Sequence, residues 1–143
     1  MKLWEAVADE FDRLDLIVEG RTMRASGAPS GSHINVRIGH GAIHYEWIWR
    51  RSFSAVDVAL HFETDDIHIN LKWLDSIKAS TEAIRKDVDL DFSAAPWGKK
   101  WAEVRFRVPF DTQTPVSEVA PKAAAIMKLL IERTYPILKS EIL

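Results

Sequence analysis

The sequence predicts an α+β domain in which an antiparallel or mixed sheet of four to five strands is flanked by helices. Three consecutive stretches alternate apolar and polar residues, as strands with one buried face do; they are Ile34–Ile38, Ile43–Arg50 and Ala55–Glu63. Apolar residues recur at helical spacing before and after these stretches, which predicts the order α-β-β-β-α-β(β)-α. The length of 143 residues indicates a single domain over residues 1–143.

The other elements follow from periodicity and from turn residues. The repeat of Leu3, Val7 and Phe11 predicts a first helix from residue 2 to about residue 18, with Gly20 just after its end. We expect a loop over 25–32 and then a second helix over about 71–84, capped by Asn70 or by an Asp of the preceding turn. A short strand over 88–92, a turn at Pro96–Gly98 and a strand over 101–108 should follow. The last helix should open at Thr114 or Ser117 and be kinked or ended by Pro136 near Tyr135.

One register fits the three alternating stretches. If tight turns join them, Trp47 faces Ile34 on one side and Val58 on the other, and every opposed pair on that side is apolar. The opposite side then gathers the polar residues, which are Asn35, Arg37, His44, Glu46, Arg50, Asp57, His61 and Glu63. We therefore expect any polar chemistry of this domain to lie on that side.

Composition excludes several classes of site. The chain has no cysteine, which rules out disulfides, thiolate zinc sites and cysteine nucleophiles. The formal charge of −2 gives no general attraction to nucleic acid or to anionic membranes, so such binding would need a local patch. No stretch has the length of a membrane-spanning helix, and no signal peptide is evident, so we expect a cytoplasmic protein without a membrane partner.

The first candidate site is a pair of histidines on the polar side. In the register above His44 lies opposite His61, with Glu46 and Glu63 diagonal to them. Two imidazoles and two carboxylates can hold a divalent metal ion or share a proton. The alternative is that these residues form ordinary cross-strand ion pairs on a sheet face. The spacing of the histidines and acids along the sequence matches no established metal-binding motif.

A second candidate site combines cations and aromatic rings, which would bind phosphates and stack on bases. Its residues are Arg50, Arg51, Trp97, Lys99, Lys100, Trp101, Arg105 and Arg107. The alternative is a set of exposed cations on an edge strand, with the two tryptophans packed over the core.

A third hypothesis is a nuclease. The order of elements matches the core of the PD-(D/E)xK nucleases, with Glu46 and Asp57 on the strands that carry the acids. The third strand reads Asp57-Val58-Ala59 and lacks the lysine of that motif, so an active nuclease of this type is not expected. A divalent-metal-dependent hydrolase or degenerate nuclease, with Glu46, Asp57 and His61 as catalytic residues, stays as the alternative.

The chain also resembles an uncharacterised domain family found at the C-terminal end of restriction-endonuclease-like and DNA-repair-associated proteins. The segments that carry the resemblance are Trp4-Glu5, Val56–Leu60, Trp73–Lys78 and Tyr135–Leu138. The resemblance implies an association with nucleic-acid handling, and it transfers no catalytic residue. We therefore expect a non-catalytic accessory or recognition module without a cofactor, whose partner is nucleic acid or a nucleic-acid-handling protein. A structural module that forms a homodimer is a further alternative.

Overall fold

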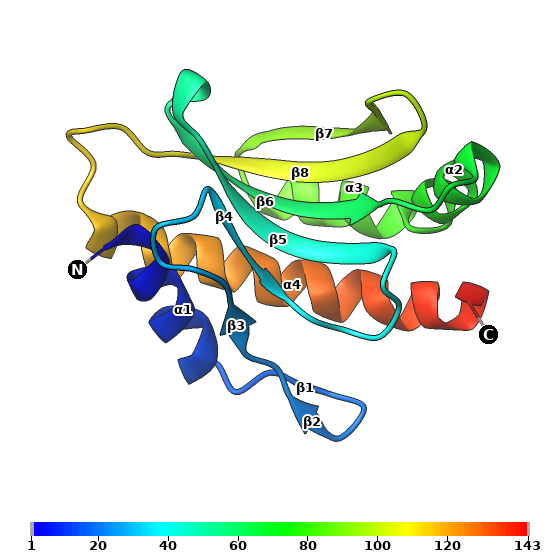
Figure 1. Cartoon of the computed structure of the whole chain (residues 1–143), viewed down its shortest axis with the longest axis horizontal. Coiled ribbons are helices and arrows are strands. Elements are labelled where there is room, and N and C mark those ends of the chain that lie inside the picture. The colour runs from blue at the N-terminus through cyan, green and yellow to red at the C-terminus, as the bar shows by residue number, and fades with distance from the viewer. Residues whose placement is uncertain (1, 143) are drawn as a thin grey trace.

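Residues 2–142 are the part of the chain that the computed structural model describes, and they form an α+β fold, as the sequence predicted (Figure 1). The helices are α1 (Leu3–Arg13), α2 (Ile67–Ser76), α3 (Lys78–Asp87) and α4 (Val116–Ile142), with a short 3-10 helix at Arg51–Phe53. The strands are β1 (Ile17–Val18), β2 (Arg21–Thr22), β3 (Ala25–Ser26), β4 (His33–Val36), β5 (Ile43–Arg50), β6 (Ala55–Phe62), β7 (Asp91–Trp97) and β8 (Trp101–Pro109).

Within these residues the main sheet has six strands in the order β3-β4-β5-β6-β8-β7, and every neighbouring pair is antiparallel. The chain leaves β6, passes through α2 and α3 to the edge strand β7, and returns as β8 between β7 and β6. Strands β1 and β2 form a separate hairpin. The sheet has more strands than the predicted four to five, because the two-residue strand β3 lies in the segment expected to be a loop and is too short to show alternation.

The predicted register of the first three long strands is confirmed. Trp47 pairs with Ile34 on β4 and with Val58 on β6, and His44 pairs with His61. The side chain of Trp47 is fully buried, because its face of the sheet is covered by helices. The alternation in the sequence was therefore a sufficient signal for this part of the fold.

The helices pack on one face of the main sheet. The Trp47 indole N–H donates to the carbonyl of Ala123 in α4 at 3.0 Å, and Phe11 of α1 packs edge-on against the same indole. Trp73 of α2 packs edge-on against Phe62 of β6, while α3 contacts α4. The other face of the main sheet carries no helix within the described residues, and we call it the open face (Figure 1).

The first helix is shorter than predicted. It ends at Arg13, whereas the sequence pattern suggested about residue 18. Asp15 adopts a positive φ of 48°, which a right-handed helix does not allow, and Leu16 accepts a hydrogen bond from the Met23 N–H at 2.7 Å. These contacts turn the chain into the β1–β2 hairpin, and Gly20, with φ of 76°, lies at its turn instead of at the helix end.

The second predicted helix is two helices. Asp66 caps α2 by accepting the His68 N–H at 2.8 Å, and the backbone at Ile77 separates α2 from α3. Asn70 is not a cap. It is fully buried inside α2, and its side-chain amide donates to the carbonyls of Thr64 and Lys100.

The region around Pro96 also differs from the prediction. The strand expected over 88–92 begins at Asp91 and continues through Pro96 to Trp97, and the turn follows at 98–100. Proline is tolerated there because β7 is an edge strand, whose outer N–H groups need no partner.

The last helix does not end at Pro136. It starts at Val116 and runs to Ile142, because the residues around the proline, including Tyr135 and the fully buried Leu138, pack on the core. Within residues 2–142 no helix is both long enough and apolar enough to cross a membrane.

Candidate functional site on the open face

The open face brings together most of the polar residues that the sequence singled out. Side chains alternate between the two faces of a strand, so the residues that lie between the buried apolar ones in the sequence point away from the helices. On the three central strands these include His44, Glu46, Ile48 and Arg50 of β5, Asp57, Ala59 and His61 of β6, and Glu103, Arg105 and Arg107 of β8. Two clusters stand out among them.

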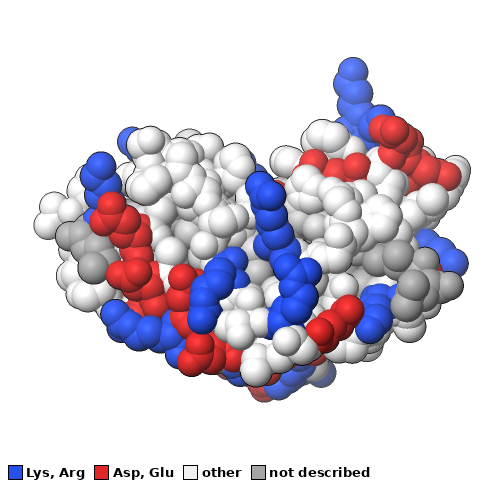
Figure 2. Space-filling model, turned by 60° about the horizontal axis from the view of Figure 1, so that its bottom comes forward, with Lys and Arg blue, Asp and Glu red and all other residues white. Residues whose placement is uncertain are grey.

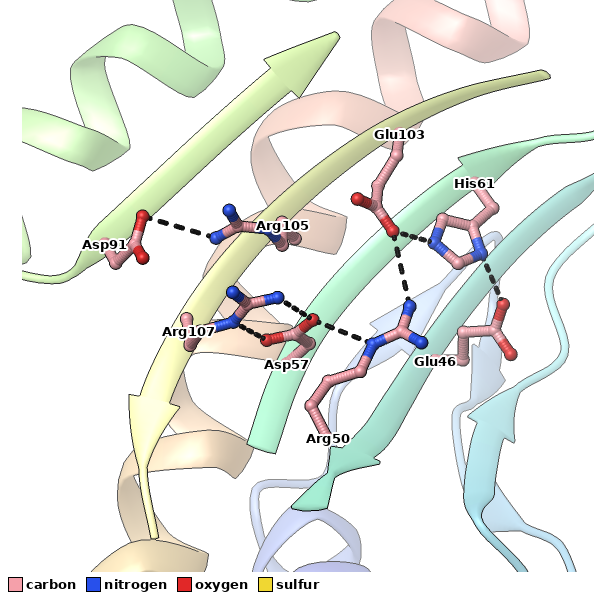
Figure 3. Close-up of polar contacts among 8 residues, drawn as sticks. All are labelled: Glu46, Arg50, Asp57, His61, Asp91, Glu103, Arg105 and Arg107. Atoms are coloured by element: carbon pink, nitrogen blue, oxygen red, sulfur yellow. Dashed lines mark hydrogen bonds and ion pairs between the residues drawn. The ribbon is translucent and has the colours of Figure 1, made fainter. Parts of the chain in front are cut away.

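The arginine cluster consists of Asp57, Arg50 and Arg107 (Figure 3). Arg107 binds the Asp57 carboxylate with two groups, Nε at 2.8 Å from Oδ1 and Nη2 at 3.0 Å from Oδ2. Arg50 donates its Nε–H to the same Oδ2 at 3.2 Å. The side chain of Asp57 is 0% exposed, so a buried carboxylate is balanced by two charged, hydrogen-bonded guanidinium groups.

The histidine cluster consists of His44, Glu46, His61 and Glu63. The His61 side chain is 1% exposed, and its ring stacks on Trp97 with centroids 4.2 Å apart. Its Nδ1 lies 2.7 Å from Glu46 Oε1 and 3.5 Å from Glu63 Oε2, while His44 Nδ1 lies 3.6 Å from the same Glu63 oxygen. Ligating atoms of His44, Glu46 and Glu63 all lie within 4.8 Å of one another.

Carboxylates on both sides of His61 set its protonation. Burial alone would lower the pKa of His61, but its hydrogen bond to Glu103 and its charge interactions with Glu46 and Glu103 outweigh burial and raise the pKa to about 9. Burial opposes ionisation of Glu46 as well, yet the neighbouring His61 holds the pKa of Glu46 below its ordinary value. In the metal-free protein the ring is therefore an imidazolium at neutral pH.

Glu103 connects the two clusters. Its Oε2 accepts from His61 Nε2 at 2.6 Å and lies 3.8 Å from Arg50 Nη2 (Figure 3). The sequence pattern placed Glu103 on the same side of its strand as Arg105 and Arg107. It gave no information on which strand would lie beside that one, so this contact was missed.

The cationic and aromatic candidates follow the open face from one end to the other. Arg50, Arg105 and Arg107 lie on the face, and Trp97 and Trp101 are paired neighbours on β7 and β8 with centroids 5.5 Å apart. Lys99 and Lys100 occupy the β7–β8 turn beside the tryptophans, whereas Arg51 lies beyond the opposite end of the face, over the ring of Trp49.

Two parts of the alternative interpretation of these residues are wrong. Strand β8 is not an edge strand, because it pairs with both β6 and β7. Trp97 and Trp101 do not pack over the helix-covered core, because they lie on the open face with His61.

Acidic residues neutralise much of this positive charge. Asp57 balances Arg50 and Arg107, and Arg105 forms an ion pair with Asp91 at 3.3 Å. On the side of the molecule that lies at the bottom of Figure 1, acidic and basic side chains are also close neighbours (Figure 2). On the open face and on that side of the molecule, basic side chains therefore lie next to acidic ones.

The residues of the nuclease hypothesis do not converge on one point. Asp57 and His61 are four residues apart on β6, which corresponds to about 13 Å. Both oxygens of Asp57 are bound by arginines, whereas Glu46 contacts His61. The geometry groups Glu46 and His61 with Glu63 and His44, without Asp57.

A pocket of about 390 Å³ opens beside the histidine cluster, along the β4–β5 hairpin. Its polar lining includes His33, Asn35, Arg37, His40, His44 and Glu46. Four of the five histidines of the chain thus lie in or beside this pocket. The sequence gave no reason to group His33 with the others.

Comparisons with models of protein families, with curated proteins and with solved structures found no match to this chain.

Proposed function

We propose that this domain is a non-catalytic recognition module that binds single-stranded nucleic acid along the open face of its main sheet. The observation that carries the proposal is that an uncovered antiparallel sheet face displays a pair of neighbouring tryptophans in line with three arginines. Aromatic rings on an open sheet face stack on unpaired bases, and nearby cations hold the backbone phosphates. The resemblance to a family associated with DNA-handling proteins favours the same ligand class.

The dimensions of the strip suit a short single strand. From Trp101 to Arg107 along β8 is six residues, or about 20 Å. Arg107 uses Nε and Nη2 to hold Asp57, and a guanidinium has five N–H donors, so a phosphate would bind the remaining donors of this side chain, which is 16% exposed and lies against the ring of Phe53. Because acids are interspersed, we expect moderate affinity with a shallow salt dependence, instead of the tight binding of a strongly basic surface.

The test is fluorescence anisotropy with labelled single-stranded and duplex oligonucleotides at two salt concentrations. Arg105→Glu is the charge-reversing variant, because within residues 2–142 Arg105 pairs only with the exposed Asp91 and its loss leaves the buried Asp57 paired. Trp101→Ala removes one stacking ring, which is worth about 1–3 kcal/mol per base, or a roughly 5- to 150-fold loss of affinity. Arg85→Glu on α3 is the matched control, because it makes the same charge change on a helix outside the open face.

We expect the wild-type protein and Arg85→Glu to bind the single strand equally, and both open-face variants to bind it weakly or not at all. Absence of binding by the wild-type protein, or equal losses in Arg105→Glu and Arg85→Glu, would refute the proposal. In the first case a protein partner or a homodimer would be the next hypothesis, and light scattering would measure the latter.

A further inference from the structure

We propose that His44, Glu46, His61 and Glu63 form a binding site for one divalent transition-metal ion of the zinc type. The proposal is independent of nucleic-acid binding, because it depends on other residues and on a different ligand. It also differs from the hydrolase hypothesis, since it assigns no role to Asp57 and requires no reaction.

The first argument is that both histidine rings are fixed in the orientation of metal ligands. The Nε2 of His44 lies 2.7 Å from the carbonyl oxygen of Gly41, and the Nε2 of His61 lies 2.6 Å from a carboxylate oxygen of Glu103. A carbonyl or carboxylate oxygen only accepts, so Nε2 carries the hydrogen in each ring. Histidines that bind metals are typically held by such a contact at the far nitrogen, which leaves Nδ1 for the metal.

The second argument is that both Nδ1 atoms lie near the same carboxylate, that of Glu63. They lie 3.6 Å and 3.5 Å from one oxygen of Glu63, and His61 Nδ1 also lies 2.7 Å from Glu46. An imidazole lone pair repels a carboxylate oxygen unless a cation lies between them. A proton on His61 supplies this cation in the metal-free protein, and a metal ion bound between the rings and the carboxylates would supply it instead.

The third argument is an unsatisfied buried atom. His61 Nδ1 is inaccessible to solvent, and despite its closeness to Glu46 it has no aligned hydrogen bond within the described residues. Such atoms are rare in folded proteins, because an unpaired buried polar group is costly. A metal ion placed between His61 Nδ1 and the two carboxylates would satisfy it.

The spacing around Glu63 suits a tetrahedral site, and the ligand atoms of His44, Glu46 and Glu63 lie within 4.8 Å of one another, while the side chain of His61 would have to shift to complete the set. Zinc binds nitrogen and carboxylate oxygen at about 2.0–2.2 Å, which places neighbouring ligand atoms about 3.4 Å apart in a tetrahedron. The separations of Glu63 Oε2 from the two Nδ1 atoms are close to this value, and the shorter contact between His61 and Glu46 would have to lengthen. Two imidazoles with two carboxylates favour zinc-type ions over Mg²⁺ or Ca²⁺, which prefer sites made of oxygen alone.

Charge and access are also suitable. The two carboxylates balance the charge of a divalent ion, and the ion can reach the cluster from the 390 Å³ pocket, where the His44 side chain is 40% exposed. His44 and His61 are paired neighbours in the ladder between β5 and β6, so their side chains leave the same face of the sheet.

The test is isothermal titration calorimetry of the full chain, purified without a polyhistidine tag and stripped with EDTA, using ZnCl₂ as the ligand. Titration with CoCl₂ adds a spectroscopic readout, since tetrahedral Co²⁺ absorbs visible light. The ligand variants are His44→Ala and Glu63→Gln, whose side chains are partly exposed, so that the fold survives. His40→Ala and His68→Ala are matched controls, because the first residue lines the same pocket and the second lies on α2.

We expect one Zn²⁺ per chain, a thermal stabilisation by ZnCl₂, and at least about tenfold weaker binding in both ligand variants but in neither control. Circular dichroism of each variant confirms that it is folded. Failure of the wild-type protein to bind zinc would mean that protons alone occupy the cluster. That result, or an equal effect of His40→Ala and His44→Ala, would overturn the proposal.

Discussion

The two clusters of the open face share strand β6, which carries Asp57 and His61, yet they balance charge in opposite ways. In the arginine cluster one buried carboxylate, Asp57, faces two guanidinium groups. In the histidine cluster the carboxylates of Glu46, Glu63 and Glu103 face the two imidazole rings of His44 and His61. The first cluster is balanced by permanent charges, because arginine is charged at every accessible pH. The second needs a cation that can be gained or lost, because the charge of histidine varies near neutrality.

The comparison indicates that the arginine cluster is mainly structural and the histidine cluster responsive. A buried ion pair fixes geometry at little net gain in stability, but breaking it leaves a buried charge. A cluster with an excess of acids binds protons or metal ions, so its stability depends on the solution. Three predictions test this difference, from the largest expected effect to the smallest.

The largest effect is expected from Asp57→Ala. The substitution removes the partner of two partly buried guanidinium groups, which lie 30% and 16% exposed, and should lower the free energy of unfolding by about 3–5 kcal/mol. Urea denaturation followed by tryptophan fluorescence measures the change. The loss should be the same at pH 6 and pH 9, because neither arginine titrates in this range.

Asp91→Ala is the control for that experiment. Asp91 pairs with Arg105 on the same face but is 61% exposed, so its removal should cost less than about 1 kcal/mol. If the two variants were equally stable, the arginine cluster would not be structural.

The second prediction concerns the pH dependence of the histidine cluster. The pKa of His61 is about 9 in the folded protein and 6.5 in an ordinary environment. Between these two pH values the folded state therefore keeps a proton on His61 that the unfolded state has released. The resulting stabilisation is complete below about pH 6.5 and is lost as the pH rises through 9; for a shift of this size it is about 3 kcal/mol.

The measurement compares wild-type protein with His61→Gln by urea denaturation at pH 6 and pH 10, with EDTA present to exclude metal ions. The stability difference between the two proteins should be larger at pH 6 than at pH 10. A difference that is independent of pH would mean that the carboxylates do not hold a proton on His61, and the contrast between the two clusters would disappear.

The sequence predicted the covered face of the sheet better than the open face. Trp47 was matched with Ile34 and Val58 because every residue on the covered side is apolar, and only one register satisfies all of them. The same register placed His44 opposite His61. The contact of Glu103 with His61 could not be predicted, because it depends on the return of β8 between β6 and β7, after two helices.

Other misses have local causes. Two-residue strands such as β3 leave no periodic signal, and the turn at Asp15 depends on a positive φ that no residue pattern specified. The pairing of Arg105 with Asp91 was missed because the two charges become neighbours only after β7 and β8 are placed in register.

The last prediction separates the clusters at the residue that touches both. Glu103→Gln keeps an acceptor for the His61 ring but removes its negative charge, so the pKa of His61 should fall by about 1 unit toward its ordinary value. Titration of the imidazole protons by NMR measures this shift, and Glu132→Gln on α4 is a control of the same chemistry. The arginine cluster should contribute less than about 1 kcal/mol to any change in the free energy of unfolding, since Glu103 is 3.8 Å from Arg50 and is not a partner of Arg107. The same variant should weaken zinc binding, because Glu103 orients His61 from the far nitrogen. A large loss of stability at pH 10, where His61 is neutral, would instead show that Glu103 belongs to the arginine cluster and that the two groups form one structural network.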